Sequence, residues 1–149
     1  MRIGRLPGAL TGILLAGGLA APAGGALAES KPMPADAKAY IQWPQDGTVI
    51  RGRTFWVRMG LSGAGVAPAG VAMAGTGHHH LLVDAPLPDD MTVAIPNDRN
   101  HLHFGRGQTE VQLDLPPGRH TLQMLLADDQ HVPHSPPLYS KKITVTLVP

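Results

Sequence analysis

The histidines are the residues of this sequence whose type and spacing could do chemistry. Seven of the eight lie in three short segments, within residues 78–80, 101–103 and 131–134. Imidazole is the commonest protein ligand for zinc and copper, and it is uncharged, and so ready to bind, near neutral pH. The chain has no cysteine, which excludes thiolate sites. The sequence therefore predicts a nitrogen-rich metal site that suits Cu(II) or Zn(II).

The first histidine segment has the pattern of a strand that carries a chelating pair. A Gly-Thr-Gly sequence precedes the three histidines, and an apolar run follows them as far as Asp84. Alternate side chains of a strand share a face, so we expect His78 and His80 to project together, with Cα atoms roughly 6.5 to 7 Å apart. His79 then points to the opposite face, where packing or capping is its expected role.

The other two histidine segments lie in loops. Residues 85–107 contain a second His-x-His pair, and so long a connection in a small domain is typical of a functional loop. The third segment is flanked by prolines, and its two histidines either complete the site or hydrogen-bond to it. The predicted metal ligands are His78, His80, His101, His103, His131 and His134. The carboxylates expected to orient these rings are Asp84, Asp128 and Asp129.

Two other functions stay open at this level. The histidines could form a satisfied polar network in a cell-envelope adaptor module, for which Trp56, on the wet face of its strand, is a natural contact residue. A metal-dependent enzyme would need an open coordination position and a substrate pocket. The chain has no nucleophile-elbow pattern, so we favour a role without catalysis. His120 is expected to be a structural, hydrogen-bonded residue at a strand start.

The elements that must position these residues are strands. Apolar and polar residues alternate in residues 54–61, 109–115 and 120–126, as in half-buried antiparallel strands. Further strands are expected at 39–43, 48–50, 91–95 and 139–148, beside the triple-histidine strand. The pattern predicts an all-β fold, a small antiparallel immunoglobulin-like β-sandwich of about seven strands. Loops cluster at the two ends of such a sandwich, so the three histidine segments can converge on one rim.

The start of the chain has the features of a secretory signal peptide. Arg2 and Arg5 precede a short apolar run, and Ala26-Leu27-Ala28 has the small residues of a cleavage site. We predict a signal peptide over residues 1–28, a flexible leader over 29–38 and the sandwich domain over 39–149. The apolar run is too short to span a bilayer, which favours a cleaved signal peptide over a membrane anchor. The mature chain would then be periplasmic and not inserted in the membrane.

The charge of the predicted mature chain is close to neutral. Removing Arg2 and Arg5 from the 12 basic side chains leaves 10, against 11 acidic ones. A nucleic-acid partner would be expected to show as a basic excess. The partners that the sequence favours are therefore a metal ion and, in the adaptor interpretation, an envelope protein.

Four motifs, taken in order, resemble a known family. They are Gly75 to Asp84, His101 to Glu110, Leu115 to Gln123, and His131 to His134 followed by Pro136-Pro137. The family is a bacterial exported one, known as domain of unknown function 4399, and the resemblance covers residues 39–148. It supports the domain boundaries and the importance of the motifs, and implies no mechanism. The sequence thus predicts an exported periplasmic protein that binds copper or zinc through a histidine-rich rim for storage, delivery or buffering.

Overall fold

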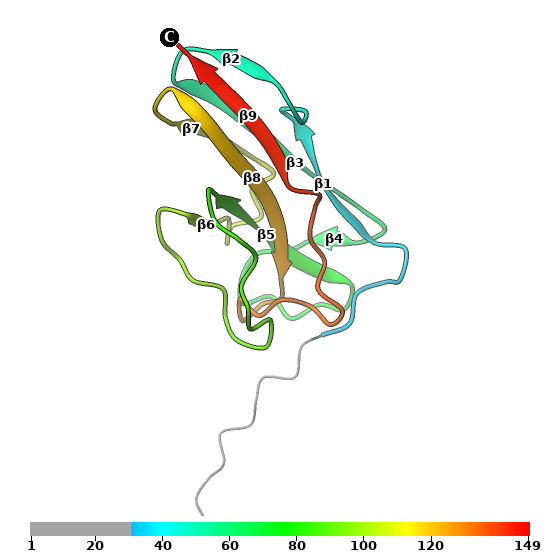
Figure 1. The fold of residues 1–149 in the computed structure, drawn as a ribbon. Coiled ribbons are helices and arrows are strands. Elements are labelled where there is room, and N and C mark those ends of the chain that lie inside the picture. Colours follow the sequence, from blue (N-terminus) through cyan, green and yellow to red (C-terminus); the bar gives the residue numbers. More distant parts are fainter. Residues whose placement is uncertain (1–30) are drawn as a thin grey trace, which may run out of the picture.

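The computed structural model describes residues 31–149, so the predicted signal peptide lies outside the described residues. Within them the fold is all-β, as predicted, and no helix there is long and apolar enough to cross a membrane. The strands divide into a three-stranded and a six-stranded sheet (Figure 1). Their bounds are β1 (Lys38–Trp43), β2 (Val49–Arg51), β3 (Thr54–Ser62), β4 (Gly65–Val66), β5 (Thr76–Val83), β6 (His101–His103), β7 (Glu110–Asp114), β8 (Gly118–Ala127) and β9 (Ile143–Val148).

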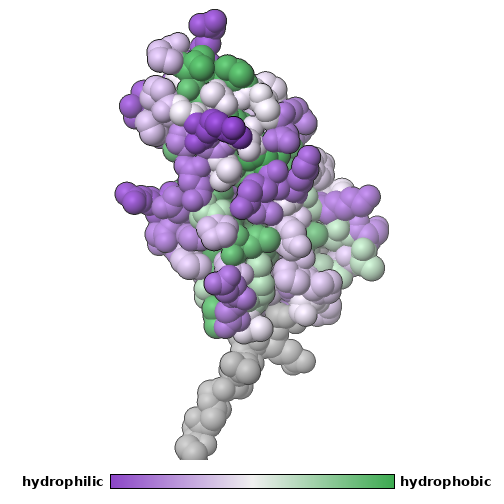
Figure 2. Space-filling view, viewed as in Figure 1, coloured by the Kyte–Doolittle hydropathy of each residue, from purple (hydrophilic) through white to green (hydrophobic). Residues whose placement is uncertain are grey.

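The three-stranded sheet, of order β1-β3-β7, is antiparallel and has one wet face. Phe55, Val57 and Met59 alternate inward along β3 and are buried, while Trp56 is 46% exposed, as its alternating pattern predicts. Tyr40 and Trp43 of β1 are exposed to a similar degree. On the face seen in Figure 2, hydrophobic residues form separate patches among hydrophilic ones.

The six-stranded sheet has mixed strand directions. Its order is β2-β9-β8-β5, and both β4 and β6 pair with the outer edge of β5. The pairs β2 with β9 and β4 with β5 are parallel. The prediction of a purely antiparallel sandwich of about seven strands was therefore wrong in strand direction and number. The physical reason is that β2, β4 and β6 have only two or three residues each, too few to show an alternating pattern.

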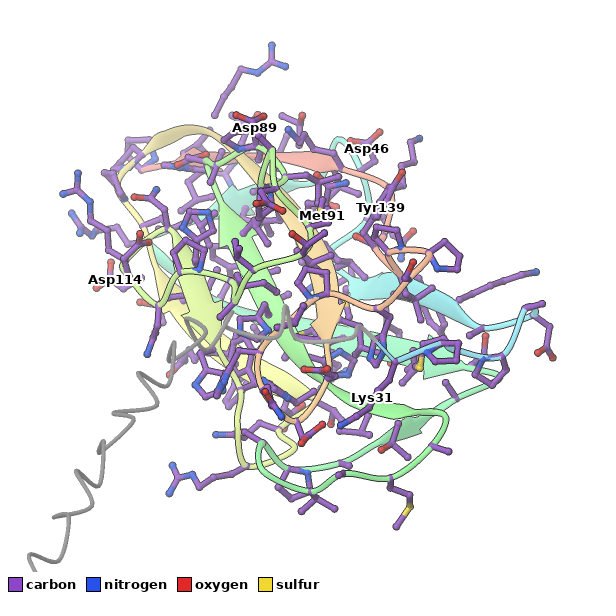
Figure 3. All side chains as sticks on the ribbon, turned by 90° about the horizontal axis from the view of Figure 1, so that it is seen from below. Lys31, Asp46, Asp89, Met91, Asp114 and Tyr139 are labelled. Atoms are coloured by element: carbon purple, nitrogen blue, oxygen red, sulfur yellow. The ribbon has the colours of Figure 1, made fainter. Side chains whose placement is uncertain are left out.

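One apolar cluster packs the two sheets against each other, and a second packs a loop against the six-stranded sheet. The main core lies between the sheets and includes Val57, Leu81 and Met124. A second cluster, centred on Leu82 and Leu125, lies on the other face of the six-stranded sheet, and the loop that carries Met91 packs against it (Figure 3). This loop is an irregular cover, and the strand predicted at residues 91–95 is absent from it. Covering the second cluster is the physical role of the long connection.

Candidate metal centre

Strand β5 divides its three consecutive histidines between the two faces of the sheet. All three side chains are fully buried. In the ladder with β8, His78 lies opposite Ala127 and His80 opposite Leu125, and both of these β8 residues belong to the second apolar cluster. His79 therefore faces the interior between the sheets, on the side of Leu81. The structure thus confirms the prediction that His78 and His80 share one face of the strand and that His79 lies on the other.

Strand β6 brings a third imidazole to the outer face. It pairs with the second half of β5, so that His103 lies opposite His80. The ring centroids are 4.9 Å apart for His78 and His80, 5.0 Å for His78 and His103, and 5.1 Å for His80 and His103. One nitrogen from each ring lies within 4.8 Å of the other two. A tetrahedral ion with bonds of about 2.0 Å requires nitrogens about 3.3 Å apart, so the rings would have to rotate to bind one.

A loop places a fourth imidazole beside these three. The ring centroid of His131 is 4.7 Å from that of His103, 5.0 Å from that of His78 and 6.2 Å from that of His80. His131 has a φ of 69°, a left-handed backbone that a non-glycine residue adopts at a cost. Asp128 holds the turn: its buried Oδ1 accepts hydrogen bonds of 2.9 Å from the Gln130 amide and 3.1 Å from the Val132 amide.

Five ring nitrogens of this cluster have no hydrogen-bond partner within residues 31–149. They are both ring nitrogens of His78 and His80 and Nε2 of His103, all of which are buried. An unsatisfied buried polar group costs about 1 to 3 kcal/mol, and most buried polar groups in proteins avoid this cost by hydrogen bonding. A polar network that satisfies itself is therefore not what the structure contains. In a neutral imidazole one nitrogen carries the proton and the other a lone pair, so each ring can offer one nitrogen to an ion.

Burial keeps these rings neutral. Desolvation, reinforced by the neighbouring imidazole of His103, lowers the pKa of His78 to about 4, although the carboxylate of Asp128 opposes the shift. Desolvation and the neighbouring His78 lower the pKa of His80 to about 2. The pKa of His103 is lowered as well, first by desolvation and then by His131. Near neutral pH the nitrogen lone pairs are thus not blocked by protons.

Two of the predicted ligands, His101 and His134, are not members of the three-imidazole group, and each has a hydrogen-bond partner of its own. The Nδ1 of His101 is 3.0 Å from Oδ1 of Asp98, and this ring is not a member of the three-imidazole group. The buried His134 donates from Nδ1 to the carbonyl of Lys31 over 2.8 Å. Its Nε2 stands 2.7 Å from the point where a Cβ on Gly77 would lie, on the face of β5 opposite to His78.

The three carboxylates predicted to orient the cluster have different partners. Asp84 serves His120: Oδ2 is 2.6 Å from Nδ1 of that ring, and Oδ1 accepts a hydrogen bond from the Thr121 amide. Because Nε2 of His120 faces the Pro116 carbonyl at 2.9 Å, both ring nitrogens face acceptors. Burial alone would lower the pKa of His120, but these hydrogen bonds and the Asp84 charge raise it. His120 is structural, as predicted, and of the three carboxylates Asp128 is the one that shapes the turn of His131.

Fold and site together define an all-β domain with a buried group of imidazoles that can hold a metal ion. The family model of domain of unknown function 4399 matches residues 57–148, and the chain belongs to this family. The matched region runs from β3 to β9 and contains every histidine of the cluster. A search of curated proteins finds no match.

Proposed function

We propose that the protein binds one transition-metal ion, Cu(II) or Zn(II), through His78, His80 and His103, with His131 as the fourth ligand. The observation that carries the proposal is that three rings with buried nitrogens, unpaired within residues 31–149, meet, one nitrogen of each lying within 4.8 Å of the other two. Imidazole nitrogens suit both ions, and Cu(II) leads the affinity order for such donors. We leave His101 and His134, which were also predicted as ligands, out of the proposed set because His101 lies beside Asp98 and Nδ1 of His134 donates to the Lys31 carbonyl.

The donor set favours storage, delivery or buffering over catalysis. A zinc ion with four side-chain ligands is typical of closed sites, whereas catalytic sites keep a position open for water or substrate. An adaptor role has separate support in the exposed Tyr40, Trp43 and Trp56 of the three-stranded sheet. A chelator separates the two functions, because an adaptor that recognises its partner through this sheet is indifferent to metal removal.

Two further assignments belong to the same proposal. Residues 1–28 would direct export to the periplasm, on the strength of their charged start, apolar run and Ala-Leu-Ala site. The sandwich would be immunoglobulin-like. In support, the first, third and seventh strands share one sheet while β5, β8 and β9 share the other, much as strands A, B and E face C, F and G in that fold.

A matched pair of variants in one strand tests metal binding. The protein, purified without a tag or chelator, should contain close to one equivalent of copper or zinc by elemental analysis. His78→Leu should lose this metal and its binding in chelator competition. His79→Leu, changed at the adjacent position but on the opposite face, should keep both. Equal binding by the two variants, or no metal in the wild-type protein under titration, would show that the cluster is not the site.

A further inference from the structure

The loop that carries His131, residues 128–134, is fastened on both sides of that histidine to the segment before the first strand. The Lys31 ammonium pairs with the carboxylate of Asp129. The Lys31 carbonyl accepts the hydrogen bond of 2.8 Å from Nδ1 of His134. One residue that is remote in sequence thus holds the loop at two points, one before and one after His131.

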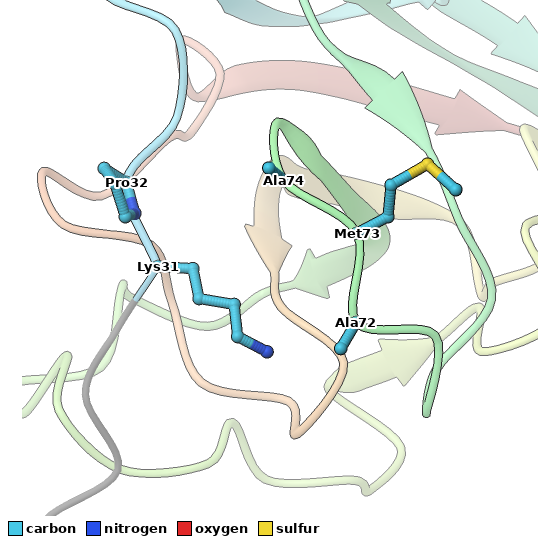
Figure 4. Close-up of a pocket in the computed structure, with 5 residues that line it drawn as sticks. All are labelled: Lys31, Pro32, Ala72, Met73 and Ala74. Atoms are coloured by element: carbon cyan, nitrogen blue, oxygen red, sulfur yellow. The ribbon is translucent and has the colours of Figure 1, made fainter.

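These contacts are sheltered to different degrees. His134 is 1% exposed, whereas in the ion pair the side chain of Asp129 is 11% exposed and that of Lys31 is 39% exposed. Lys31 and Pro32 also form one wall of an apolar pocket whose other wall is residues 72–74 (Figure 4). The backbone oxygen of Asp129 accepts a further hydrogen bond of 2.9 Å from the Gly70 amide. Lys31 is therefore packed and bonded at the loop, and the contact is more than an isolated surface ion pair.

His131 depends on such restraints more than the other three imidazoles do. His78, His80 and His103 lie in strands whose ladders fix them. His131 lies in a loop, with a backbone conformation that is kept only when its surroundings hold it. The restraints are the Asp128 turn, a hydrogen bond of 2.9 Å from the Ile95 amide to the His131 carbonyl, and the contacts of Lys31.

We propose that Lys31 and His134 are positioning residues for His131, and that residues 31–37, just before β1, form a latch that sets how fast the metal leaves. The inference rests on the proposed function. With the latch closed, His131 stays beside the other three rings. With the latch open, His131 withdraws more often, the ion is left with three ligands, and it dissociates faster. Displacement of this segment would then be a route to metal delivery.

The test is the rate at which Zn²⁺ passes from the loaded protein, purified without a tag from its full-length gene, to an excess of chromogenic chelator. His134→Leu removes the donor to Lys31, whereas His134→Asn keeps an N–H in a comparable place. Asp129→Asn removes only the ion pair. Lys38→Met, a substitution at an exposed position of β1 outside these contacts, is the surface control. Urea unfolding of each variant in chelator reports any change in the metal-free fold.

We expect His134→Leu to release Zn²⁺ about five to thirty times faster than the wild type, which corresponds to about 1 to 2 kcal/mol at 1.4 kcal/mol per factor of ten. Asp129→Asn should accelerate release by up to about fivefold. His134→Asn and Lys38→Met should stay close to the wild type.

Unchanged release from zinc-loaded His134→Leu and Asp129→Asn would overturn the latch and leave the metal site standing. If His134→Leu does not fold, Asp129→Asn decides by the same criterion. Failure of the wild type to bind Zn²⁺ or Cu²⁺ would overturn both proposals. Faster release that is matched by an equal loss of metal-free stability in all four variants, the control included, would also refute a positioning role.

Discussion

Replacing His80 with leucine should stabilise the metal-free fold and reduce the further stabilisation that metal gives. The imidazole of His80 is fully buried, and neither of its nitrogens has a hydrogen-bond partner among the described residues. A leucine of similar size would remove both unsatisfied groups and lie against Leu125 on the opposite strand. The residues of the metal site thus lower the stability of the metal-free fold.

The magnitudes can be worked from this environment. Relief of unsatisfied buried nitrogens returns about 1 to 3 kcal/mol per group, and imperfect packing of a new side chain takes back about 1 kcal/mol. Because two nitrogens are relieved, metal-free His80→Leu should be about 1 to 5 kcal/mol more stable than the wild type. At a free metal concentration 100 times Kd, the wild type should gain about 2.7 kcal/mol. The variant, which lacks one ligand, should gain much less.

Urea unfolding, followed with chelator and again with excess Zn²⁺, measures both quantities. In chelator the midpoint of the variant should lie above that of the wild type, and in Zn²⁺ this difference should shrink or reverse. A variant that is less stable than the wild type in chelator, and that keeps the full increment from Zn²⁺, would refute the reasoning. It would mean that His80 is satisfied in the fold and is not a ligand.

Three further predictions concern the surroundings of the site. Gly77→Ala places a Cβ 2.5 Å from a backbone oxygen of β8, so the free energy of unfolding should fall by about 1 to 3 kcal/mol in urea titrations. Asp128→Ala frees the turn of His131, and Zn²⁺ affinity in chelator competition should weaken by about 10- to 100-fold. The raised pKa of His120 means that its pairing with Asp84 stabilises the fold fully below about pH 6.5, and that this contribution is lost as pH rises through the higher folded-state value. Unfolding in chelator between pH 5 and 9 should therefore show the difference between wild type and His120→Leu shrinking with rising pH, and a constant difference would contradict the assignment.

The long strands were predictable from sequence, and the short ones were not. Residues 54–61 alternate over enough positions to identify β3 and its wet face. By contrast, β4 has two residues, and its parallel pairing with β5 depends on the path of the chain. The second apolar cluster was not predictable either, because the hydrophobic residues of the loop that covers it do not recur at a regular spacing.

The strand period was also sufficient to predict part of the site. It placed His78 and His80 on one face and His79 on the other, and the structure confirms this. The sequence indicated both His131 and His134 as ligands and could not distinguish which of the two lies beside the other rings. That outcome depends on the left-handed backbone at position 131, and neither that turn nor the contact with Lys31 leaves a periodic signal.

The four imidazoles come from three separate parts of the chain: strand β5, strand β6 and the loop after β8. An ion bound among them would cross-link these parts, as disulfides do in other small domains. This chain has no cysteine, so its cross-link would need neither an oxidant to form nor a reductant to break. Since closing a loop lowers the entropy of the unfolded chain, the ion would stabilise the fold most where the sequence separation is largest. Such a cross-link can be lost and formed again as the supply of metal changes.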